Sequence, residues 1–420
     1  MTTRRLTPFV MLEVSSVLSA ISSGMTYIVI PWLILETTGS ALLSGIVIAV
    51  KGIVSFVIYP IAGTLVDLVG RRRVAIVADA AVAVSAALFV ILSTAFGPNL
   101  AFLIGITLLG ALFESPGFTA RKALVANTAV AGNVPLARAN GLTESIRGIG
   151  WIAGPAAGSF SVALIGPINT FWVIGLGYLL SMGAVACIRI SHSVDGQSDL
   201  DEDRKGFIRQ AIDGFKALAS DRPLAILVAF IVILDMVYIP AEEIVLPFYF
   251  NQRNDPTALG IVISSMVLGG TVGALLFEWM TRHFSIPVII RVSVIGSCTL
   301  LLAISTFPPT WFFALIGFTL GLVWGPINPL LSLLVQRRFP SAMQGRVFGV
   351  QLALWSVTPP IAMPFVGALV EQFGPQPVYF WLMFATFVLG LGIVFVPVLG
   401  QLAQVREGGL GEDLRRPRRS

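Results

Sequence analysis

The segment SHSVDGQSDLDEDRKGFIRQAIDGFKALASDR, residues 191–222, is the longest polar interruption in this chain of 420 residues. Apolar stretches lie on both sides of it, and a membrane-spanning helix needs about 20 mainly apolar residues. The pattern therefore predicts twelve spans, six before the segment and six after it. They are expected at residues 7–35, 40–69, 74–95, 99–120, 138–165, 168–190, 223–250, 257–281, 285–307, 310–335, 343–370 and 376–399.

The overall composition favours the same class of protein. Hydrophobic residues make up 56% of the chain and charged residues 12%, with a mean hydropathy of +0.88, whereas a soluble domain has about 25% charged residues. A soluble enzyme and a nucleic-acid-binding protein are therefore disfavoured. The two cysteines and two histidines offer neither a disulfide framework nor a metal cluster. No phosphate-binding Gly-Lys-Ser/Thr sequence supports ATP drive and no nucleophile–base pair supports a membrane enzyme, so we expect no cofactor and no metal site.

The polar segment also suggests how the chain is divided. We expect an N-terminal six-helix bundle over residues 1–190, a cytoplasmic linker over 191–222, a C-terminal six-helix bundle over 223–400 and a disordered basic tail over 401–420. Within the linker, residues 206–219 place their apolar side chains on one helical face and charged ones opposite. That pattern predicts a helix lying on the membrane surface.

The distribution of positive charge predicts the orientation of the chain. If both termini are cytoplasmic, 23 of the 27 Lys and Arg lie on the inner side and only Arg253 lies outside, as the positive-inside rule requires. The basic pI then reflects charge facing lipid headgroups and needs no nucleic-acid partner. The apolar stretch after Arg5 runs for about 28 residues, longer than the ~7–15 of a signal peptide, so we expect a retained first span.

The two halves resemble each other weakly. Residues 109–116 of the fourth span and 320–326 of the tenth carry Leu-Gly, an aromatic residue and Pro in the same order, each followed by a basic segment. Such an internal repeat is the usual build of a secondary transporter, with the substrate site near the midplane between the halves.

Two glycine-containing motifs stand out within this plan. GTLVDLVGRRR, residues 63–73, allows a tight turn in which Asp67 can accept from an arginine or from amides at a helix N-terminus. GWIAGPAAGS, residues 150–159, has small residues four apart, which let two helices touch, and a proline that bends the helix. The alternatives are an ordinary positive-inside loop and a role in packing only. The residues singled out in the two motifs are Gly63, Asp67, Gly70, Arg71, Arg72 and Arg73, and Gly150, Gly154, Pro155 and Gly158.

Together with the twelve-span plan, these motifs resemble two signatures of the major facilitator superfamily: its span 2–3 loop motif, and the glycine–proline motif of proton-coupled drug antiporters. Ser159 stands where a final glycine is usual, and Leu68 where a basic residue is common. The resemblance implies an all-α membrane protein with twelve transmembrane helices in two pseudo-symmetric six-helix bundles.

A closer resemblance extends over most of the chain. DLVGRRRVAIVADA (67–80), PAEEIVLP (240–247), GPINP (325–329) and QGRVFG (344–349) resemble the Tap-type tetracycline/aminoglycoside efflux pumps. This likeness implies an exporter of small drug-like molecules in the bacterial inner membrane, driven by the proton gradient through alternating access. We expect a monomer in contact with membrane lipid. Related branches carry siderophores or lysophospholipids, so such a carrier is the alternative. The family has an acid in the first span where this chain has Ser22-Ser23-Gly24.

Carboxylates embedded in the seventh span are the favoured proton carriers. A charge at the bilayer centre costs ~2.5–3.5 kcal/mol, so an embedded acid needs a partner, a wet cavity or a proton. Asp235, Tyr238 and Glu242 share one helical stripe, with Glu243 beside it, and Pro240 frees backbone groups that a cavity could hydrate. The alternative is that the two glutamates lie near the outer surface and are merely solvated.

Three further embedded charges are candidates for the same site. Lys51, in the second span, could pair with a carboxylate of the seventh span or attract an anionic substrate group. Glu114 and Glu13 could carry protons, or could instead form buried hydrogen bonds between helices.

Charges toward the inner side form a predicted gate. Asp79, Glu144 and Arg147 are expected near Asp67, Arg71, Arg121 and Arg346, as ion pairs that close the inner face in the outward-open state. A static structural cluster is the competing interpretation.

Aromatic and amide side chains suit a cavity for amphiphilic compounds. The predicted cavity residues, for each of which ordinary core packing is the alternative, are Lys51, Tyr238, Trp324, Asn328, Gln351 and Trp355.

Overall fold

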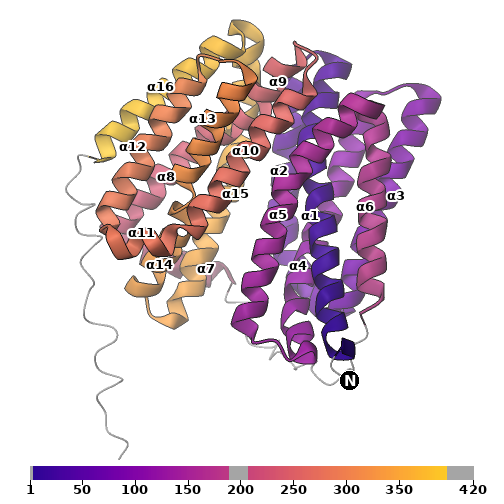
Figure 1. Cartoon of the computed structure of the whole chain (residues 1–420), viewed down its shortest axis with the longest axis horizontal. Coiled ribbons are helices and arrows are strands. Elements are labelled where there is room, and N and C mark those ends of the chain that lie inside the picture. Colours follow the sequence, from indigo (N-terminus) through magenta and orange to yellow (C-terminus); the bar gives the residue numbers. More distant parts are fainter. Residues whose placement is uncertain (1–2, 189–206, 395–420) are drawn as a thin grey trace, which may run out of the picture.

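A computed structural model describes residues 3–188 and 207–394 of the chain, all in helices and short connections. Two groups of helices lie side by side, one drawn in indigo to magenta and the other in rose through orange to yellow (Figure 1). The first group, the N-half, consists of α1 (Thr3–Thr38), α2 (Ala41–Val69), α3 (Arg71–Phe96), α4 (Leu100–Gly132), α5 (Leu136–Ile165) and α6 (Pro167–Ala186).

The second group, the C-half, follows a separate helix, α7 (Phe207–Ser220). Its elements are α8 (Arg222–Pro240), the π-helical turn η1 (Ala241–Val245), α9 (Leu246–Asn251), α10 (Pro256–Leu275), α11 (Phe277–His283), α12 (Ile286–Ile304), α13 (Thr310–Trp324), α14 (Ile327–Arg338), α15 (Ser341–Phe373) and α16 (Pro375–Val394).

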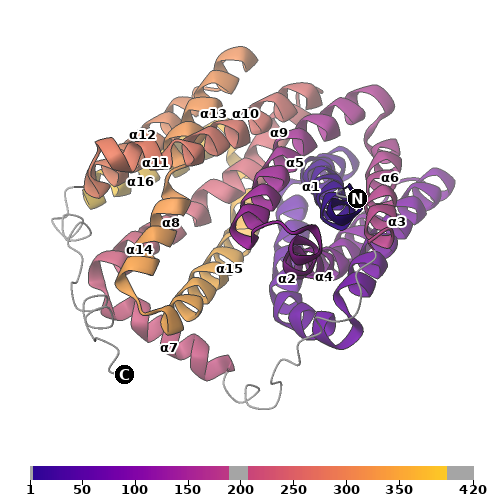
Figure 2. The ribbon, with the colours of Figure 1, turned by 60° about the horizontal axis from the view of Figure 1, so that its bottom comes forward.

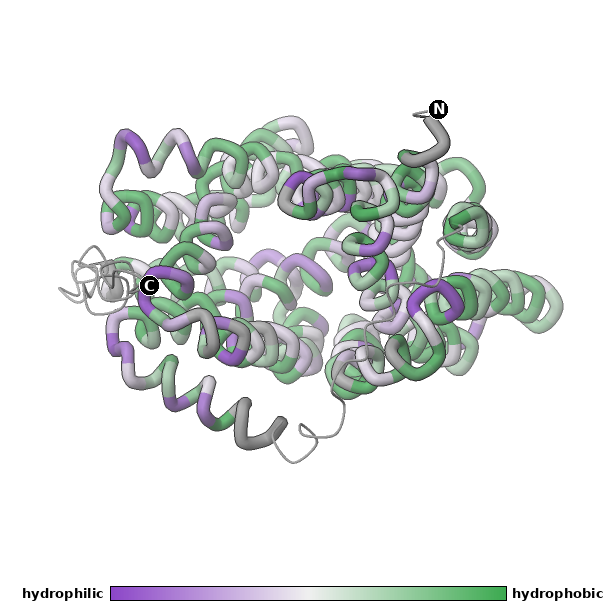
Figure 3. The backbone as a smooth tube through the Cα atoms, turned by 90° about the horizontal axis from the view of Figure 1, so that it is seen from below, coloured by the Kyte–Doolittle hydropathy of each residue, from purple (hydrophilic) through white to green (hydrophobic). Residues whose placement is uncertain are grey.

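The predicted all-helical membrane fold is confirmed. Within the described residues, eleven helical segments are long and apolar enough to cross a membrane. At the position of the twelfth predicted span lies α16, which has 20 residues and no charged side chain. Large apolar side chains such as Leu164, Phe365 and Trp381 are exposed on the outside, a surface that suits lipid. In Figure 3 hydrophobic residues prevail along the helices, and hydrophilic ones are more frequent on the turns that face the viewer.

Three predicted spans differ from a continuous α-helix. The span at 223–250 is built from α8, η1 and α9, because Pro240 cannot donate a backbone hydrogen bond and a π turn follows it. The span at 310–335 is interrupted between α13 and α14 at Gly325 and Pro326, and the span at 257–281 changes from α10 to α11 after Leu275. These interruptions leave backbone groups at membrane depth, which is tolerated where the chain is buried in protein or lines a cavity.

The helix α7 lies against the C-half, close to the start of α15 (Figure 2). Leu218 is buried in the core of the C-half, whereas Ile212 and Phe215 are exposed. A Cβ atom on Gly214 would lie 2.6 Å from the carbonyl oxygen of Arg346, and Asp213 forms an ion pair with the same arginine at 3.7 Å. The rest of the predicted linker and the predicted basic tail lie outside the described residues.

The two halves meet along two helix pairs at the end away from the arginines that begin α3. In the first pair, α2 and α15, a Cβ on Gly45 would lie 2.5 Å from the carbonyl oxygen of Met363. In the second pair, α5 and α10, a Cβ on Gly260 would lie 2.1 Å from Ser159 Oγ. Both contacts depend on the absence of a side chain, so the backbones of opposite halves approach each other directly.

A carboxylate reinforces the first of these contacts. Glu371 of α15 accepts a hydrogen bond from the backbone N–H of Leu42, at 3.0 Å, and another from the hydroxyl of Ser40. The first turn of an α-helix has N–H groups without an intrahelical acceptor. The C-half therefore supplies an N-terminal cap to a helix of the N-half.

Candidate functional site

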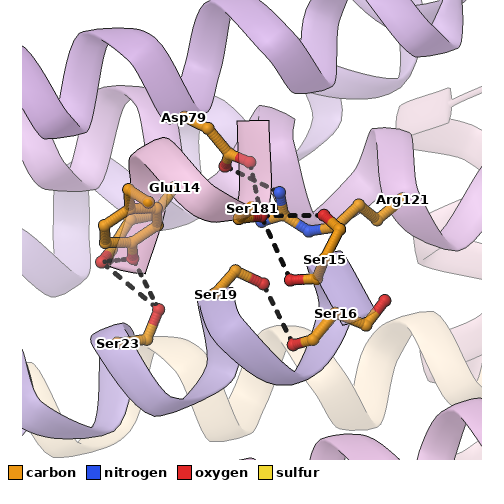
Figure 4. Close-up of polar contacts among 9 residues, drawn as sticks. Ser15, Ser16, Ser19, Ser23, Asp79, Glu114, Arg121 and Ser181 are labelled. Carbon is orange, nitrogen blue, oxygen red and sulfur yellow. Dashed lines mark hydrogen bonds and ion pairs between the residues drawn. The ribbon is translucent and has the colours of Figure 1, made fainter. Parts of the chain in front are cut away.

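A polar cluster lies inside the N-half, among helices that are otherwise apolar. Lys51 Nζ of α2 lies 3.5 Å from Glu114 Oε2 of α4. The hydroxyl of Tyr178, on α6, donates to Glu114 Oε1 at 2.7 Å, and that of Ser23, on α1, does so at 3.5 Å (Figure 4). Four helices thus converge on one carboxylate. The sequence suggested a partner for Lys51 in the seventh span, whereas its ion-pair partner in this structure is Glu114.

Two glutamates of the C-half face this cluster. Glu242, in the π turn η1, lies close to the hydroxyls of Tyr27 and Tyr238, and the neighbouring Glu243 lies close to the hydroxyl of Tyr27. The ammonium of Lys51 is near enough to attract Glu243 electrostatically. Both glutamates are half-buried. One cation is therefore paired with a carboxylate of the N-half and also acts electrostatically on a carboxylate of the C-half.

A cavity of about 190 Å³ lies within the C-half, among α8, η1, α10, α12 and α13. It brings together three of the predicted site residues, Tyr238, Glu242 and Trp324, while Met266 and Ser297 contribute to the same wall. The hydroxyl of Ser297 is buried and has no hydrogen-bond partner within the described part of the chain. The cavity is thus apolar, with one acid and one unpaired hydroxyl.

The remaining predicted cavity and carrier residues lie elsewhere. Asp235 is half-buried on α8 and makes no hydrogen bond or ion pair within residues 3–188 and 207–394. Asn328 is exposed on α14, beyond the break in the tenth span. Gln351 is buried and Trp355 half-buried on α15, and the side-chain N–H groups of both lack a partner among the described residues.

Glu13 connects two helices of the N-half. It is 7% exposed and accepts a hydrogen bond from Thr143 of α5 at 2.5 Å. Its second carboxylate oxygen has no partner among the residues that the structure describes. The hydrogen bond from Thr143 to one oxygen of Glu13 fits the interpretation that Glu13 connects two helices. The second oxygen, which has no partner there, could still take up a proton.

The predicted gate charges pair within their own halves in this conformation. Asp79 and Arg121 form a buried ion pair at 2.7 Å, and the hydroxyl of Ser181 donates to Asp79 Oδ2 at 2.7 Å (Figure 4). Glu144 pairs with Arg147, three residues further along α5. A latch across the halves is therefore absent among these described side chains and remains a prediction for another conformation.

The arginines of the span 2–3 loop bind other acceptors. Arg71 donates to the side-chain oxygen of Asn127 at 2.8 Å, and Arg72 to a backbone carbonyl at the end of α6. Arg73 is exposed, and a Cβ atom on Gly63 or Gly70 would meet no described atom within 4 Å. The side chain of Asp67 lies outside the description.

The span 5 motif places α5 directly on α1. Cβ atoms on Gly150, Gly154 and Gly158 would lie 2.5, 2.7 and 2.9 Å from atoms of that helix. The opposite side of the motif faces the C-half, since Gly260 lies against Pro155 and Ser159. The motif is thus in contact with both halves of the molecule.

Sequence reasoning missed several polar residues that the structure brings to these sites. Tyr27, Tyr178, Ser181 and Ser297 each lie in an apolar span and contact, or could contact, a charged group. The chain has only 6 tyrosines, and a lone hydroxyl in an apolar helix signals a buried hydrogen bond. The identity of each partner depends on helix packing, which no periodicity shows.

Two groups of membrane-length helices that meet at one end and enclose ion pairs are the architecture expected of a secondary transporter. Residues 12–363 match the Major Facilitator Superfamily, and the chain belongs to this family. It is a multi-pass membrane transporter of small molecules, related to multidrug and macrolide efflux pumps, and is not an enzyme.

Individual relatives extend over nearly the whole chain. The multidrug efflux pump Tap of Mycolicibacterium fortuitum is 30% identical over 405 residues, which are 96% of this chain and 98% of that protein. Macrolide efflux protein A of Streptococcus pyogenes is 24% identical over 409 residues, 92% and 94% of the two chains. The crystal structure of a variant of the nucleoside transporter NupG has a TM-score of 0.76 at 14% identity and covers 92% of this chain and 100% of that chain, so the fold is shared.

Proposed function

We propose that this protein is a proton-coupled exporter of small amphiphilic compounds, acting by alternating access in the bacterial plasma membrane with both termini in the cytoplasm. The observation that carries the proposal is the half-buried ion pair of Lys51 with Glu114 in the N-half, at 3.5 Å, close enough to Glu243 of the C-half for Lys51 to act on that carboxylate electrostatically. Its substrates would include tetracycline- or aminoglycoside-like drugs, which the resemblance of its motifs to the Tap-type efflux pumps implies. A 30% identical relative is a multidrug efflux pump, which supports this class of substrate.

The charge arrangement can connect protonation to movement of the halves. A hydrogen bond that involves a charged group contributes about 1.5–3 kcal/mol, and a proton on the carboxylate removes most of that attraction. Protonation of Glu114 would free Lys51 to interact with Glu243, and protonation of Glu243 would have the opposite effect. A ligand or proton shifts a conformational equilibrium only by its differential affinity for the two states. The proposed exchange of partners by Lys51 would supply such a difference in proton affinity.

Asp235 and Glu242 are the proposed proton carriers. Asp235 has no cationic partner among the described residues, so protonation is the simplest way to remove its charge from the membrane. Glu242 interacts with two neutral phenols and lines the C-half cavity, where a substrate could displace its proton. Glu243, Glu114 and Glu13 are the further candidates, each next to a polar partner named above.

The gate of the proposed cycle would form at the other end of the molecule. The halves meet here at the end away from Arg71, through Gly45 on α2 and Gly260 on α10. Opening of that end would require closure at the end that carries Asp67, Arg71 and Arg346. Glycine and proline in residues 150–158 would let α5 bend and slide against α1 and α10.

Transport by purified protein in proteoliposomes tests the proposal. An imposed pH gradient should drive uptake of labelled tetracycline into proteoliposomes that contain the protein in inverted orientation. Asp235→Asn and Glu242→Gln should each lower the rate of this gradient-driven uptake at least tenfold. Glu278→Gln is the matched control, because that carboxylate is 78% exposed on α11. If gradient-driven uptake is unchanged in both variants, the assignment of Asp235 and Glu242 as proton carriers is wrong. Uptake of lysophospholipid but of neither tetracycline nor an aminoglycoside would remove the proposed substrate class.

A further inference from the structure

We infer that the cavity inside the C-half is a binding site for a compact aromatic amine carrying one positive charge, or for the amine-bearing end of a larger molecule. This inference rests on the proposed function, since it specifies which small amphiphilic compounds the transporter binds. It places that site within one bundle, among α8, η1, α10, α12 and α13, rather than between the two halves.

The size of the cavity limits the ligand. Its volume is about 190 Å³, whereas an apolar protein cavity of roughly 150 Å³ binds benzene and drug-sized ligands need roughly 300–1,000 Å³. A single ring with a short chain therefore fills it. A four-ring drug would fit only by leaving most of its surface outside.

The charge of the cavity favours a cation. Glu242 is the one charged residue among those that line it. Its neighbours Tyr27 and Tyr238 are neutral, whereas the cation Lys51 acts on the adjacent Glu243. A ligand ammonium would therefore supply the missing counter-charge through a charge-assisted hydrogen bond.

The walls suit the rest of such a ligand. The rings of Tyr238 and Trp324 can contact an ammonium through their faces or a ligand ring through stacking. Met266, with its flexible thioether, and the leucines beside it form the apolar remainder. An anion would be repelled here, and a neutral ring would leave the carboxylate without a counter-charge.

An unpaired hydroxyl provides an independent indication of a ligand. Ser297 is 1% exposed, lines the cavity and has no hydrogen-bond partner among the described residues. A buried polar group without a partner costs about 1–3 kcal/mol, a cost that serines such as Ser159 and Ser265 avoid by bonding a carbonyl of their own helix. Five buried serine hydroxyls lack a partner within the part of the chain that the structure describes, and Ser297 is the one of these five that lines the cavity. A polar atom of a bound ligand would provide the missing hydrogen-bond partner for the hydroxyl of Ser297.

Binding of three one-ring probes to the detergent-solubilised full chain, without a proton gradient, tests this site by calorimetry. Benzylamine, protonated at pH 7, should bind at least tenfold more tightly than benzyl alcohol, and benzoate should not bind. Glu242→Gln should abolish the preference for the amine over the alcohol. Ser297→Ala, which removes one oxygen atom, should weaken benzylamine binding about three- to tenfold.

A cavity-filling variant locates the bound probe. A Cβ on Gly270, which lines the cavity, would meet one atom, the carbonyl oxygen of Gly321, at 3.9 Å, so Gly270→Val has room for its side chain. It should lower benzylamine affinity at least tenfold. Gly183→Val is the matched control, because nothing lies within 4 Å of a Cβ there and the residue is in α6 of the other half. It should bind benzylamine like the wild type.

Equal binding of the amine, the alcohol and benzoate by the wild type would overturn the inference. Benzylamine binding that is unchanged by Gly270→Val would also overturn it. If that variant does not fold, benzylamine binding unchanged by Ser297→Ala would overturn it instead. Failure here is distinct from failure of the proposed function. Gradient-driven export without selective binding of benzylamine contradicts only this site. Selective binding without gradient-driven export contradicts only the proton coupling.

Discussion

The buried ion pair between Asp79 and Arg121 predicts a strongly non-additive pair of substitutions. The two side chains are 2% and 9% exposed, with 2.7 Å between Arg121 Nη1 and Asp79 Oδ1. Removal of one partner of such a pair leaves a buried charge without compensation and costs about 3–5 kcal/mol. We therefore expect Asp79→Asn and Arg121→Gln each to lower the free energy of unfolding by about that amount.

The double variant should be more stable than either single variant. Two neutral amides leave no buried charge, and Ser181 can still donate to the residue at position 79. The remaining loss comes from weaker hydrogen bonds and should be about 1–3 kcal/mol, whereas the two single costs together are about 6–10 kcal/mol. The interaction free energy in the double-mutant cycle should therefore exceed about 3 kcal/mol.

Equilibrium unfolding in mixed detergent micelles measures these free energies. The matched control is the surface pair Glu278 and Arg282, four residues apart on α11, with side chains 78% and 70% exposed. The cycle Glu278→Gln and Arg282→Gln should give an interaction of no more than about 0.5 kcal/mol. Additive single costs at Asp79 and Arg121 would refute the reasoning, as would equal interaction free energies for the two pairs.

Three further substitutions follow from close contacts. Gly154→Ala should lower the free energy of unfolding by about 1–3 kcal/mol, because its Cβ would lie 2.7 Å from the backbone of α1. The control Gly141→Ala, whose Cβ would have nothing within 4 Å, should be neutral or stabilising. Equal effects of the two substitutions would contradict the packing argument. Gly45→Ala should lengthen the distances between spin labels on α2 and α15 at the end where the halves meet, because its Cβ would lie 2.5 Å from the carbonyl oxygen of Met363. Unchanged distances, or the same change in the control Gly63→Ala on α2, would contradict this prediction. Tyr178→Phe should lower the free energy of unfolding by about 1.5–3 kcal/mol, through loss of the 2.7 Å hydrogen bond to a carboxylate; a loss below about 0.5 kcal/mol would show that bond to be unimportant.

The membrane fold could be predicted from the sequence because its cause is local. Twenty apolar residues in a row determine a span wherever the chain places them, and the polar segment at 191–222 stands apart from them. The interruptions were harder to predict. Pro240 and Pro326 were both visible, yet whether proline kinks a helix, opens a π turn or ends a segment depends on which neighbours accept the freed backbone groups.

The candidate site was only partly predictable for a related reason. A charged residue within an apolar span, such as Lys51, has a high free-energy cost of insertion into the membrane. The need for a partner therefore follows from the sequence. The choice between Glu114 and a carboxylate of the seventh span does not, because it depends on helices α2 and α4 being neighbours. The sequence shows that Ser297 needs a hydrogen-bond partner but does not distinguish it from other serines in apolar spans, which most often bond their own helix.

The cap that Glu371 gives to α2 has a consequence for how easily the halves could part. When two proteins or domains separate in an apolar medium, a broken hydrogen bond is simply lost, and the loss slows the separation. Here the amide of Leu42 and the hydroxyl of Ser40 lie at the very start of their helix, beside a chain turn. Water admitted by separation would take the place of the carboxylate on these donors, so the exchange would be nearly isoenthalpic and add little to the activation barrier.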